Sequence, residues 1–158
     1  KDQESRIEQA AEQLAPLVAR TRELGCELGL YNHGGWGGVP ENLVAVCQHL
    51  RNSKGAEHVG IVYNFHHAHE HLTQIESALA LMKPYLLCLN LNGMNDEPKP
   101  KILPLGQGKH DERLLKLVAG SGYDGPIGIL DHRDDVDAEQ SLRENLEGLD
   151  KWIAKQGE

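Results

Sequence analysis

The sequence predicts an α/β fold of parallel strands, each followed by a helix. Short apolar runs alternate with longer segments in which apolar residues recur at helical spacing. The runs are apolar at nearly every position, as in strands that are covered by helices. The chain has 158 residues, of which 39% are hydrophobic, so it can bury one core. We therefore expect residues 1–158 to form a single unit.

The first half of the chain is expected to contain two helices and two strands. Pro16 should kink or break the first helix. A strand over residues 26–32 and a glycine-rich loop come next, and Pro40 then suits the first turn of the second helix. A second strand covers residues 58–65. The apolar stripes of the two helices are Ile7, Ala11, Leu14 and Val18, and Leu43, Val44, Val46, Cys47 and Leu50.

The second half continues the alternation with three helices and two strands. The strands cover residues 85–93 and 125–132, and a long loop over 94–109 leads to a helix that opens near Asp111. The last helix follows an acidic cap over residues 134–137. The three stripes are Leu72, Ile75, Leu79 and Met82; Leu114, Leu115, Leu117 and Val118; and Leu142, Leu146, Leu149 and Ile153. About four strands and five helices are expected, as an open doubly wound sheet or as part of a (β/α)8 barrel.

Composition excludes several partners. A formal net charge of −8 without a dense basic stretch argues against nucleic acid and anionic membrane surfaces. No apolar run approaches the roughly 18 residues of a membrane span. No signal peptide opens these residues, so a cytoplasmic location is expected, and a periplasmic or secreted one stays open if a signal lies in missing sequence. Cys26, Cys47 and Cys88 are odd in number and lack CxxC spacing, which favours buried thiols over a disulfide framework.

Polar residues follow every predicted strand, at the end where α/β proteins hold their ligands. The site is predicted to comprise Tyr31, Asn32, His33 and Trp36; Asn64, His66 and His67; Asn90 and Asn92; and Asp131, His132 and Arg133. His33 and His67 are the candidate catalytic bases, and the other residues are candidates for substrate binding.

Each of these features also has a structural interpretation. The four glycines of residues 34–38 suit a tight turn as well as a ligand-facing loop. The histidine tract over 66–71 lacks the zincin spacing and suits a solvated helix start, in which His67 and His71 would share a face. Asn90 and Asn92 either bind a polyol or satisfy one another. The polar residues at 131–133 either bind a ligand or lead into the acidic helix cap.

The stretches "LGLYNHGG", "VGIVYNFHHAH", "LLCLNLNG" and "ILPLGQGKHDERLLKLVAGSGYDGPIGI" resemble, in this order, the second half of sugar phosphate isomerase/epimerase-like proteins. Those proteins have the xylose-isomerase-like TIM barrel, and their superfamily includes the AP endonucleases. The resemblance covers nearly the whole chain and implies the C-terminal half of a (β/α)8 barrel. It also implies a partner, either the missing N-terminal half-barrel or a second copy, because half a barrel exposes two strand edges.

The resemblance also bears on metal binding. Metal-dependent members carry a Glu, an Asp, a His and a Glu at the ends of these four strands. The corresponding residues here are Tyr31, Asn64, Asn90 and Leu130, so the usual ligands are absent. His67 falls where endonuclease-like members place an additional histidine ligand. The metal and cofactor are therefore unknown, and a divalent metal would need other ligands.

Isomerase or epimerase chemistry on a carbohydrate or sugar derivative is the function that the resemblance implies. The reaction removes a proton next to a carbonyl and needs donors to the developing oxyanion. Tyr31, Asn64, Asn90 and Arg133 are the candidate donors, and Trp36 could stack on a sugar face. The alternatives are a catalytically inactive protein that binds a carbohydrate or another protein, and a keto-glycoside lyase or hydrolase. The acidic charge and the missing ligands oppose a DNA-repair role.

Overall fold

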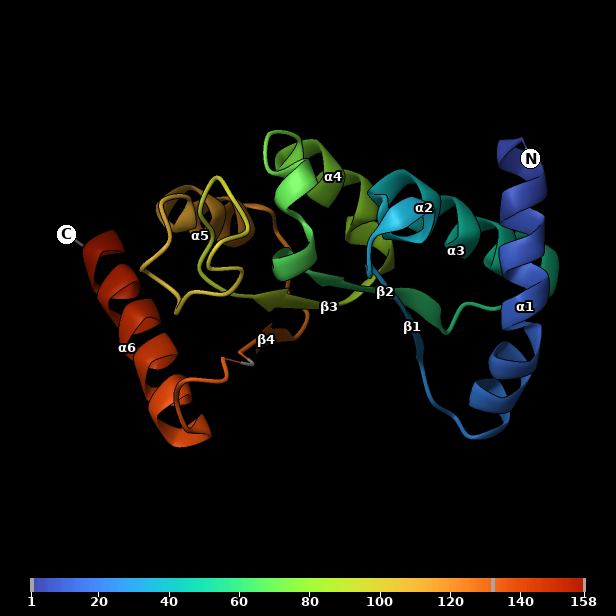
Figure 1. Ribbon diagram of the computed structural model, residues 1–158. Coiled ribbons are helices and arrows are strands. Elements are labelled where there is room, and N and C mark those ends of the chain that lie inside the picture. The colour runs from blue at the N-terminus through green and yellow to red at the C-terminus, as the bar shows by residue number, and fades with distance from the viewer. Residues whose placement is uncertain (1, 132, 158) are drawn as a thin grey trace. The chain divides into compact units, whose positions relative to one another are not determined.

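The computed structural model describes residues 2–131 and 133–157. His132, a predicted substrate-binding residue, lies outside the described residues. The helices span Gln3–Glu23 (α1), Gly35–Gly38 (α2), Pro40–Lys54 (α3), Ile75–Met82 (α4), Asp111–Gly120 (α5) and Ala138–Gln156 (α6). The strands span Leu28–Tyr31 (β1), Val59–Asn64 (β2), Leu86–Leu91 (β3) and Ile127–Ile129 (β4) (Figure 1). They form one sheet in the order β1-β2-β3-β4, so the predicted α/β class is confirmed.

The chain divides into two compact units. Unit 1 comprises Lys1–Tyr63 and Ser77–Cys88, and unit 2 comprises Asn64–Glu76 and Leu89–Glu158. The β1–β2 pair belongs to unit 1 and the β3–β4 pair to unit 2, and both pairs are parallel. Each unit is described in turn.

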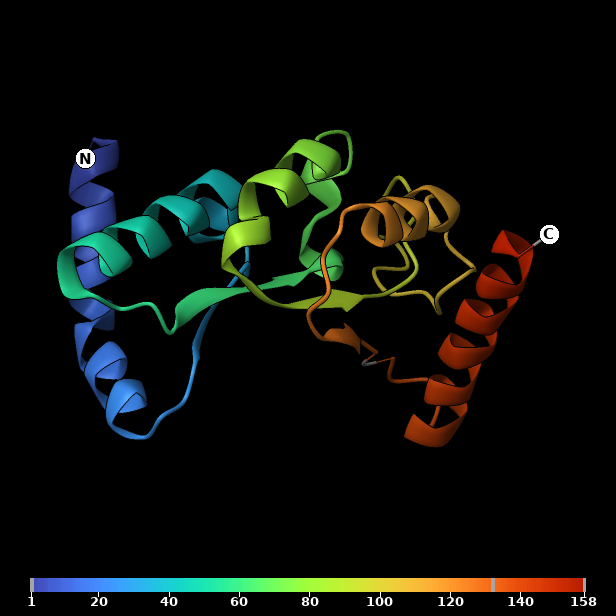
Figure 2. The ribbon, with the colours of Figure 1, turned by 180° about the vertical axis from the view of Figure 1, so that it is seen from behind.

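The helices of unit 1 confirm one sequence prediction and correct another. The predicted break at Pro16 is wrong, because α1 continues through this residue to Glu23. Pro40 does open α3, which ends at Gly55 in the left-handed conformation with φ 58°. Both ribbon views show α1 lying beside α3 (Figures 1 and 2).

The strands of unit 1 pack against the segment that leads into β3. A Cβ atom on Gly60 would lie 2.4 Å from the carbonyl oxygen of Tyr85, so only glycine permits this approach. Arg51 of α3 lies over the ring of Tyr85, with its Cζ 4.8 Å from the ring centroid, and its Nε and Nη2 both donate to the carbonyl of Val59. These contacts fix the end of α3 to the start of β2.

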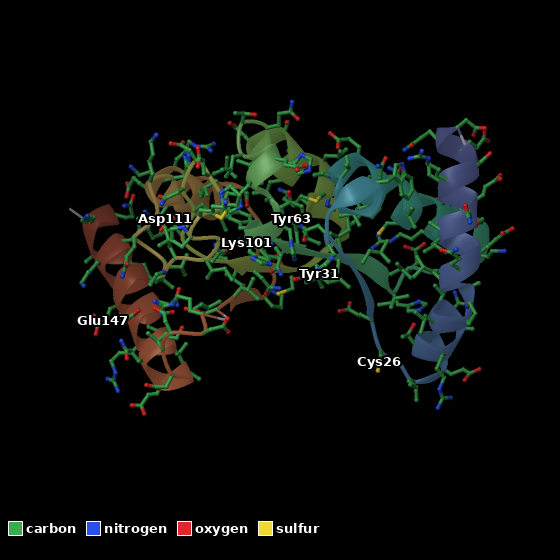
Figure 3. All side chains as sticks on the ribbon, viewed as in Figure 1. Cys26, Tyr31, Tyr63, Lys101, Asp111 and Glu147 are labelled. Carbon is green, nitrogen blue, oxygen red and sulfur yellow. The ribbon has the colours of Figure 1, made fainter. Side chains whose placement is uncertain are left out.

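The three cysteines are free thiols in different environments. Cys47 is fully buried in α3, and burial raises the pKa of its thiol to about 12. Cys88 is half-buried. Cys26 is exposed, and its sulfur projects from the loop before β1 (Figure 3). The expectation of buried thiols is therefore wrong for Cys26.

In unit 2 the ends of the helices follow the predicted signals. α5 begins at Asp111. Asp137 caps α6, because its side chain accepts hydrogen bonds from the backbone N–H groups of Glu139 and Gln140, as the acidic cap predicted. Among the described residues, no helix has both the length and the apolar character needed to cross a membrane.

The histidine tract departs from the prediction. Residues 65–67 and 69–71 form two short 3₁₀ turns, and α4 begins only at Ile75. The predicted solvated helix start, with His67 and His71 on one helical face, is therefore wrong. His66 is 5% exposed, so the tract also turns one of its rings inward.

The apolar stripe of α6 is the second departure in unit 2. Leu142, Leu146 and Ile153 are 51%, 44% and 54% exposed. The buried residues of this helix are instead Ser141 and Asn145. α6 therefore turns Ser141 and Asn145 toward its own unit and leaves three of the four residues of its apolar stripe exposed, while Leu149 is half-buried.

Candidate functional site

In unit 1 the candidate residues follow β1 directly. Asn32 is fully buried, whereas Tyr31 is 42% exposed and His33 is exposed. The rings of Tyr31 and His33 are stacked, with centroids 6.1 Å apart and planes inclined by 30°. The backbone N–H of His33 also donates to the carbonyl of Tyr31 at 3.0 Å. The two exposed side chains therefore form one aromatic surface at the carboxyl end of β1.

Glycine conformation sets the direction of the chain after His33. Gly34 has φ 85° and ψ 178°, a region that is essentially restricted to glycine. The next four residues form α2, a short helix where the sequence predicted only a loop. The conformation of Gly34 therefore lets the chain turn from β1 directly into α2.

Trp36 of α2 is half-buried and is held by other elements of unit 1. Its indole Nε1 donates to Gln3 of α1 at 3.0 Å, and its carbonyl accepts from Asn42 of α3 at 2.7 Å. Together with α1, β1 and α3, Trp36 lines an apolar cavity of about 330 Å³. The indole N–H is thus engaged within the unit, and stacking of Trp36 on a sugar stays a prediction.

In unit 2 the first candidates lie at the end of β2 and in the turn after it. Asn64 and His66 are buried and His67 is half-buried. The rings of His66 and His67 meet edge to face, with centroids 3.9 Å apart and planes at 61°. The structure therefore brings these two predicted residues together.

His69, in the second 3₁₀ turn, is a candidate that the sequence analysis did not select. Burial lowers the pKa of His69, and the charges of Lys101 and His110 lower it further, against the effect of a hydrogen bond with the His66 backbone. Its Nε2 is buried without a hydrogen bond partner among the described residues. Near neutral pH, His69 is therefore a neutral imidazole, the form that accepts a proton.

Asn90 and Asn92 have separate environments rather than a shared one. Asn90 pairs with Gly128 of β4, where a Cβ atom would lie 2.2 Å from the Asn90 Oδ1. Asn92 lies just beyond β3 and is 1% exposed; its Nδ2 donates to the carbonyl of Gly93 and to the sulfur of Met94. The hydrogen bonds of Asn92 therefore serve the loop that follows it.

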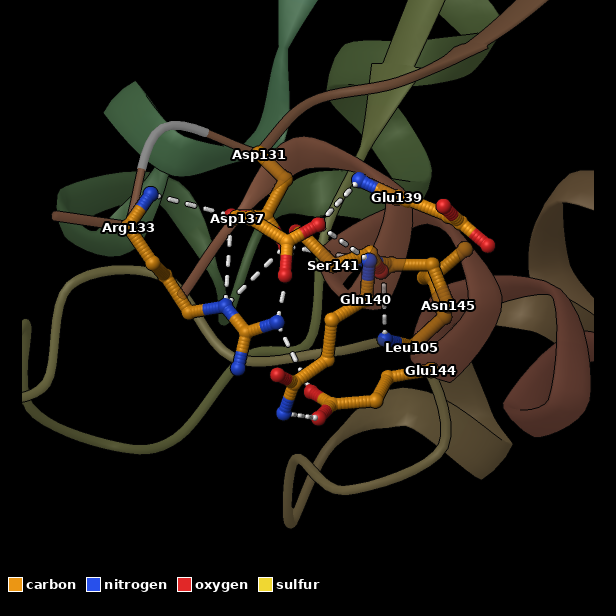
Figure 4. Close-up of polar contacts among 9 residues, drawn as sticks. All are labelled: Leu105, Asp131, Arg133, Asp137, Glu139, Gln140, Ser141, Glu144 and Asn145. Atoms are coloured by element: carbon orange, nitrogen blue, oxygen red, sulfur yellow. Dashed lines mark hydrogen bonds and ion pairs between the residues drawn. The ribbon is translucent and has the colours of Figure 1, made fainter. Parts of the chain in front are cut away.

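The most completely connected candidates are Asp131 and Arg133 after β4 (Figure 4). The Arg133 Nε lies 3.2 and 3.1 Å from the two carboxylate oxygens of Asp131. Its Nη2 donates to Ser141 at 3.2 Å and to Glu144 at 2.7 Å, both in α6. Among the residues drawn in Figure 4, Nη1 is the guanidinium nitrogen that makes no hydrogen bond. Arg133 is thus fixed in position, and within residues 2–131 and 133–157 its Nη1 keeps its N–H groups as donors.

Asn145 connects this cluster to the long loop of unit 2. Its Nδ2 donates to Asp131 Oδ2 and to the carbonyl of Ser141, both at 2.9 Å, and its Oδ1 accepts from the backbone N–H of Leu105 at 2.9 Å. Asn145 is fully buried, and its hydrogen bonds with Ser141 and Leu105 are shielded from water. The side-chain amide of Asn145 therefore links the loop after β3, through Leu105, to the segment after β4, through Asp131.

The charges in this cluster are mutually stabilised. Burial raises the pKa of Asp131, but hydrogen bonds from Ser141, the Arg133 backbone and Asn145, together with the Arg133 charge, outweigh burial and hold the pKa below its usual value. The pKa of Glu144 is lowered by hydrogen bonds from Gln140 and Arg133. Both carboxylates are therefore ionised at neutral pH and keep the guanidinium in place.

A second buried carboxylate fixes the loop between β3 and α5. Asp111 is 3% exposed, and it accepts hydrogen bonds from the backbone N–H groups of Met94, Gly106 and Gly108 at 2.7 to 2.9 Å. Burial raises the pKa of Asp111, and the three hydrogen bonds act against this rise. The loop that carries Lys101 is therefore anchored at both ends.

A cavity of about 360 Å³ lies between this loop and the segment after β4. Its polar lining residues are Lys101, Gln107, Arg133, Asp134 and Asp135. Sequence reasoning identified only Arg133 among them, because the loop residues have no regular spacing that marks them. A signal did exist for Ser141 and Asn145, since polar residues four apart on an amphipathic helix define a face of their own.

The residues present do not fit the metal site of the metal-dependent relatives. Asn64 and Asn90 offer neutral amides, and Leu130 offers no ligand atom. Divalent metals in proteins favour carboxylate oxygen or imidazole. Within residues 2–131 and 133–157, no three His, Cys, Asp or Glu side chains are grouped to hold a metal ion.

Parallel strands, intervening helices and polar groups gathered at the carboxyl ends of the strands define a protein built of (β/α) units. A family model described as the xylose isomerase-like TIM barrel matches residues 1–152. The chain therefore belongs to this family. No curated protein sequence matches the chain significantly.

Two solved structures share the fold. A 3-keto-D-glucoside 4-epimerase, YcjR, from Escherichia coli superimposes with a TM-score of 0.67 at 14% identity, over 98% of this chain and 56% of its own. A D-tagatose 3-epimerase-like protein superimposes with a TM-score of 0.63 at 20% identity, over 93% of this chain and 57% of its own. The present chain thus spans little more than half the length of either neighbour.

Proposed function

We propose that this chain takes part in the isomerisation or epimerisation of a keto sugar or sugar derivative, by moving a proton next to a carbonyl group. Membership of the xylose isomerase-like family supports this proposal. The two structural neighbours are a 3-keto-D-glucoside 4-epimerase and a D-tagatose 3-epimerase-like protein. A ketose or keto-glycoside is therefore the substrate class to test first.

The fixed guanidinium of Arg133 is the observation that carries the proposal. Removal of a proton next to a carbonyl places negative charge on the carbonyl oxygen, and a donor already held in position stabilises that charge most effectively. Arg133 is held by Asp131, Ser141 and Glu144, and it lines the 360 Å³ cavity. Its remaining nitrogen supplies the hydrogen bond to the developing oxyanion.

The other polar residues of the cavity suit a substrate that carries several hydroxyl groups. Lys101 donates hydrogen bonds, Asp134 and Asp135 accept them, and Gln107 does both. A polyol needs this mixture of donors and acceptors, because each hydroxyl group offers one donor and two lone pairs. Asp131 and Asn145 act as positioning residues behind Arg133.

Three histidines are candidates for the base. His33 and His67 are the predicted residues, and the environment of His69 adds a third. The Lys101 charge that lowers the pKa of His69 belongs to a side chain that also lines the cavity. A base with a lowered pKa stays active below pH 6.5, the ordinary value for histidine.

Proton exchange in D₂O tests the chemistry without knowledge of the product. The purified chain is incubated with D-tagatose, D-fructose and a 3-keto-D-glucoside, and the C–H groups beside the carbonyl are followed by proton NMR. Catalysed loss of one signal is expected, and Arg133→Lys should slow it by about 10²- to 10³-fold. Arg143→Lys is the matched control, since this arginine is exposed and its ion pair is with Glu139 on the surface of α6. Absence of exchange with every sugar by a folded chain would contradict the proposal.

The base is then assigned with His33→Asn, His67→Asn and His69→Asn. The substitution that removes the base should abolish exchange and leave sugar binding within about twofold. If His69 is the base, the rate should fall as the pH drops below 6.5, where its imidazole becomes protonated. Chelation is expected to leave the exchange rate unchanged, because the strand ends do not offer the ligands of the family metal site.

A second candidate is a protein that binds a carbohydrate without chemistry. The replacement of carboxylate and imidazole by Tyr31, Asn64, Asn90 and Leu130 at the strand ends favours it. Calorimetric binding of one of these sugars by a chain that shows no exchange would support this candidate over the enzyme. Release of a free aglycone from a keto-glycoside would instead support a lyase or hydrolase.

A further inference from the structure

A second cavity of unit 2, here called the α6 cavity, lies between α6, the start of α5 and the loop before α5. Its volume is about 210 Å³, and residues 105–107 of the loop and Glu112 of α5 line it together with α6. Every residue of this lining belongs to unit 2. The α6 cavity is distinct from the 360 Å³ cavity of Arg133, because Gln107 is the one lining residue that the two share.

Two glycines bring the backbone of α6 against the loop at the α6 cavity. A Cβ atom on Gly148 would overlap the carbonyl oxygen of Leu105, and one on Gly106 would lie 3.2 Å from the Gly148 Cα. Larger residues of α6 lie one helical turn to either side, Glu144 before Gly148 and Trp152 after it. The wall of the α6 cavity therefore includes glycine backbone, flanked along the helix by an acid and an indole.

Trp152 gives the α6 cavity an aromatic wall with an unused donor. The residue is half-buried. Its Nε1 is buried and has no hydrogen bond partner among the residues that the structure describes. A buried donor without an acceptor costs free energy. Side chains at binding sites commonly adjust when a ligand enters, so a ligand oxygen beside the ring can supply the missing acceptor.

Two carboxylates of the lining are held as ionised acceptors. Hydrogen bonding by Lys116 lowers the pKa of Glu112. Hydrogen bonds from Gln140 and Arg133 lower the pKa of Glu144 (Figure 4). Both carboxylates are therefore ionised at neutral pH, and each oxygen has a second lone pair that can accept from a ligand.

The cations of the lining are two lysines of α6. Lys151 lies 3.8 Å from the third carboxylate, that of Glu147, and the charge of Lys155 acts on Glu112. Gln107 adds a side-chain amide, which both donates and accepts. Three carboxylates and two ammonium groups leave the lining close to neutral, with donors and acceptors intermixed.

We propose that the α6 cavity binds the pyranose ring of a neutral sugar. The indole face of Trp152 packs against the C–H face of the ring, and the sugar hydroxyl groups donate to the glutamates and accept from the lysines. An anion or an organic cation would meet like charges in this lining, whereas a neutral polyol meets none. The described lining contains no histidine that could act as a base, so the sugar is held without reaction. This binding goes beyond the proposed function and does not depend on it.

Fluorescence of Trp152 tests the binding directly. Trp36 and Trp152 are the two tryptophans of the chain, so a Trp36→Phe chain emits from Trp152 alone. The probe is methyl β-D-glucopyranoside, a pyranose without a free carbonyl group that cannot undergo the exchange reaction. We expect a saturable change of emission with a dissociation constant in the millimolar range, and protection of Trp152 from quenching by acrylamide, because a small cavity offers few contacts.

The same titration decides whether the site exists and which class of ligand it takes. Circular dichroism shows whether Trp36→Phe has folded, and Trp36→Tyr replaces it if it has not. In a folded chain, no saturation by the glucoside up to about 100 mM would overturn the proposal. Inorganic phosphate and tetramethylammonium are titrated at constant ionic strength and should give no saturable change. Tighter binding of either ion than of the glucoside would refute a site for a neutral sugar.

Glu147→Gln and Asp150→Asn in the Trp36→Phe chain test the place of the sugar. Both variants replace an acid of α6 by its amide, but Glu147 lines the α6 cavity, whereas Asp150 is exposed outside that lining (Figure 3 labels Glu147). Glu147→Gln should weaken glucoside binding by about fivefold, because a charged acceptor forms the stronger hydrogen bond. Asp150→Asn should change it by less than about twofold. Equal effects of the two variants would show that the sugar does not occupy the α6 cavity.

Discussion

The glycine loop of unit 1 and the two polar loops of unit 2 perform the same task by different means. Both follow parallel strands and present polar side chains there. The loop after β1 is directed by the conformation of Gly34, and its histidine and tyrosine remain exposed. The loops after β3 and β4 are held by Asp111 and Asn145, buried side chains that come from α5 and α6. The first loop should therefore tolerate changes of side chain and resist changes of backbone, and the other two should do the reverse.

The largest effect is expected from Asp111→Ala. Three backbone N–H groups, those of Met94, Gly106 and Gly108, would lose their acceptor, and the one of Met94 is buried. The free energy of unfolding should fall by about 3–5 kcal/mol in urea titrations. Glu112→Ala changes the next residue, an exposed one, and should cost no more than about 0.5 kcal/mol. Equal losses for the two variants would show that Asp111 does not anchor the loop.

Asn145→Asp tests whether the loops of unit 2 depend on the side-chain amide at position 145. The substitution places a carboxylate beside Asp131 and removes the amide donor between them. We expect a loss of about 2–4 kcal/mol at pH 7, partly recovered on acidification as the pair takes up a proton. Gln48→Glu adds the same charge on the exposed face of α3 and should change the unfolding free energy by less than about 0.5 kcal/mol. A pH-independent loss at position 145 would argue against charge repulsion as its cause.

In unit 1 the decisive test is Gly34→Ala. No atom lies within 4 Å of the added Cβ, so the cost comes from backbone conformation alone and should be about 1–3 kcal/mol. Gly37→Ala has the same open space without a positive φ and should be neutral or slightly stabilising, because alanine suits a helical turn better than glycine. Thermal unfolding of both variants measures the difference. If the two changes cost the same, backbone conformation does not direct this loop.

The smallest effect is expected on how the stability of the folded chain falls as the pH is lowered. Since the pKa values of Asp131 and Glu144 are lowered in the folded chain, the stability that they contribute is present above their ordinary values of 3.8 and 4.5. It is lost as the pH falls below those values toward the lower folded pKa. Arg133→Gln should reduce this loss, and melting temperatures between pH 3 and pH 7 would show a flatter curve. Curves that differ only by a constant would show that Arg133 does not set these pKa values.

The sequence predicted those features of the fold that follow from local spacing and end signals. Apolar runs located all four strands, and Pro40 and Asp137 marked where helices begin. The predicted break at Pro16 and the predicted helix start in the histidine tract were wrong. Helical spacing located the apolar stripe of α6 but did not reveal that Ser141 and Asn145 are the buried residues of this helix.

The candidate site was predictable where it follows directly from strand ends, as for Asp131 and Arg133. The spacing of Ser141 and Asn145 marks a polar face of α6, but the hydrogen bonds of Ser141, Glu144 and Asn145 to Arg133 and Asp131 were not predictable, because they join residues that are 8 to 14 positions apart. The charge of Lys101 acts on His69 because of the fold of an irregular loop, for which periodicity offers no guide. Buried polar networks are specified by three-dimensional geometry, and sequence patterns report them only weakly.

Cys47 can report how often unit 1 opens under native conditions. Its thiol is fully buried and its pKa of about 12 keeps it protonated, so a thiol reagent can modify it only when α3 separates from the strands. Cys26, exposed in the same unit, reacts without any such opening and supplies the reference rate. The ratio of the two labelling rates in a single unaltered chain therefore measures how often this unit opens under native conditions.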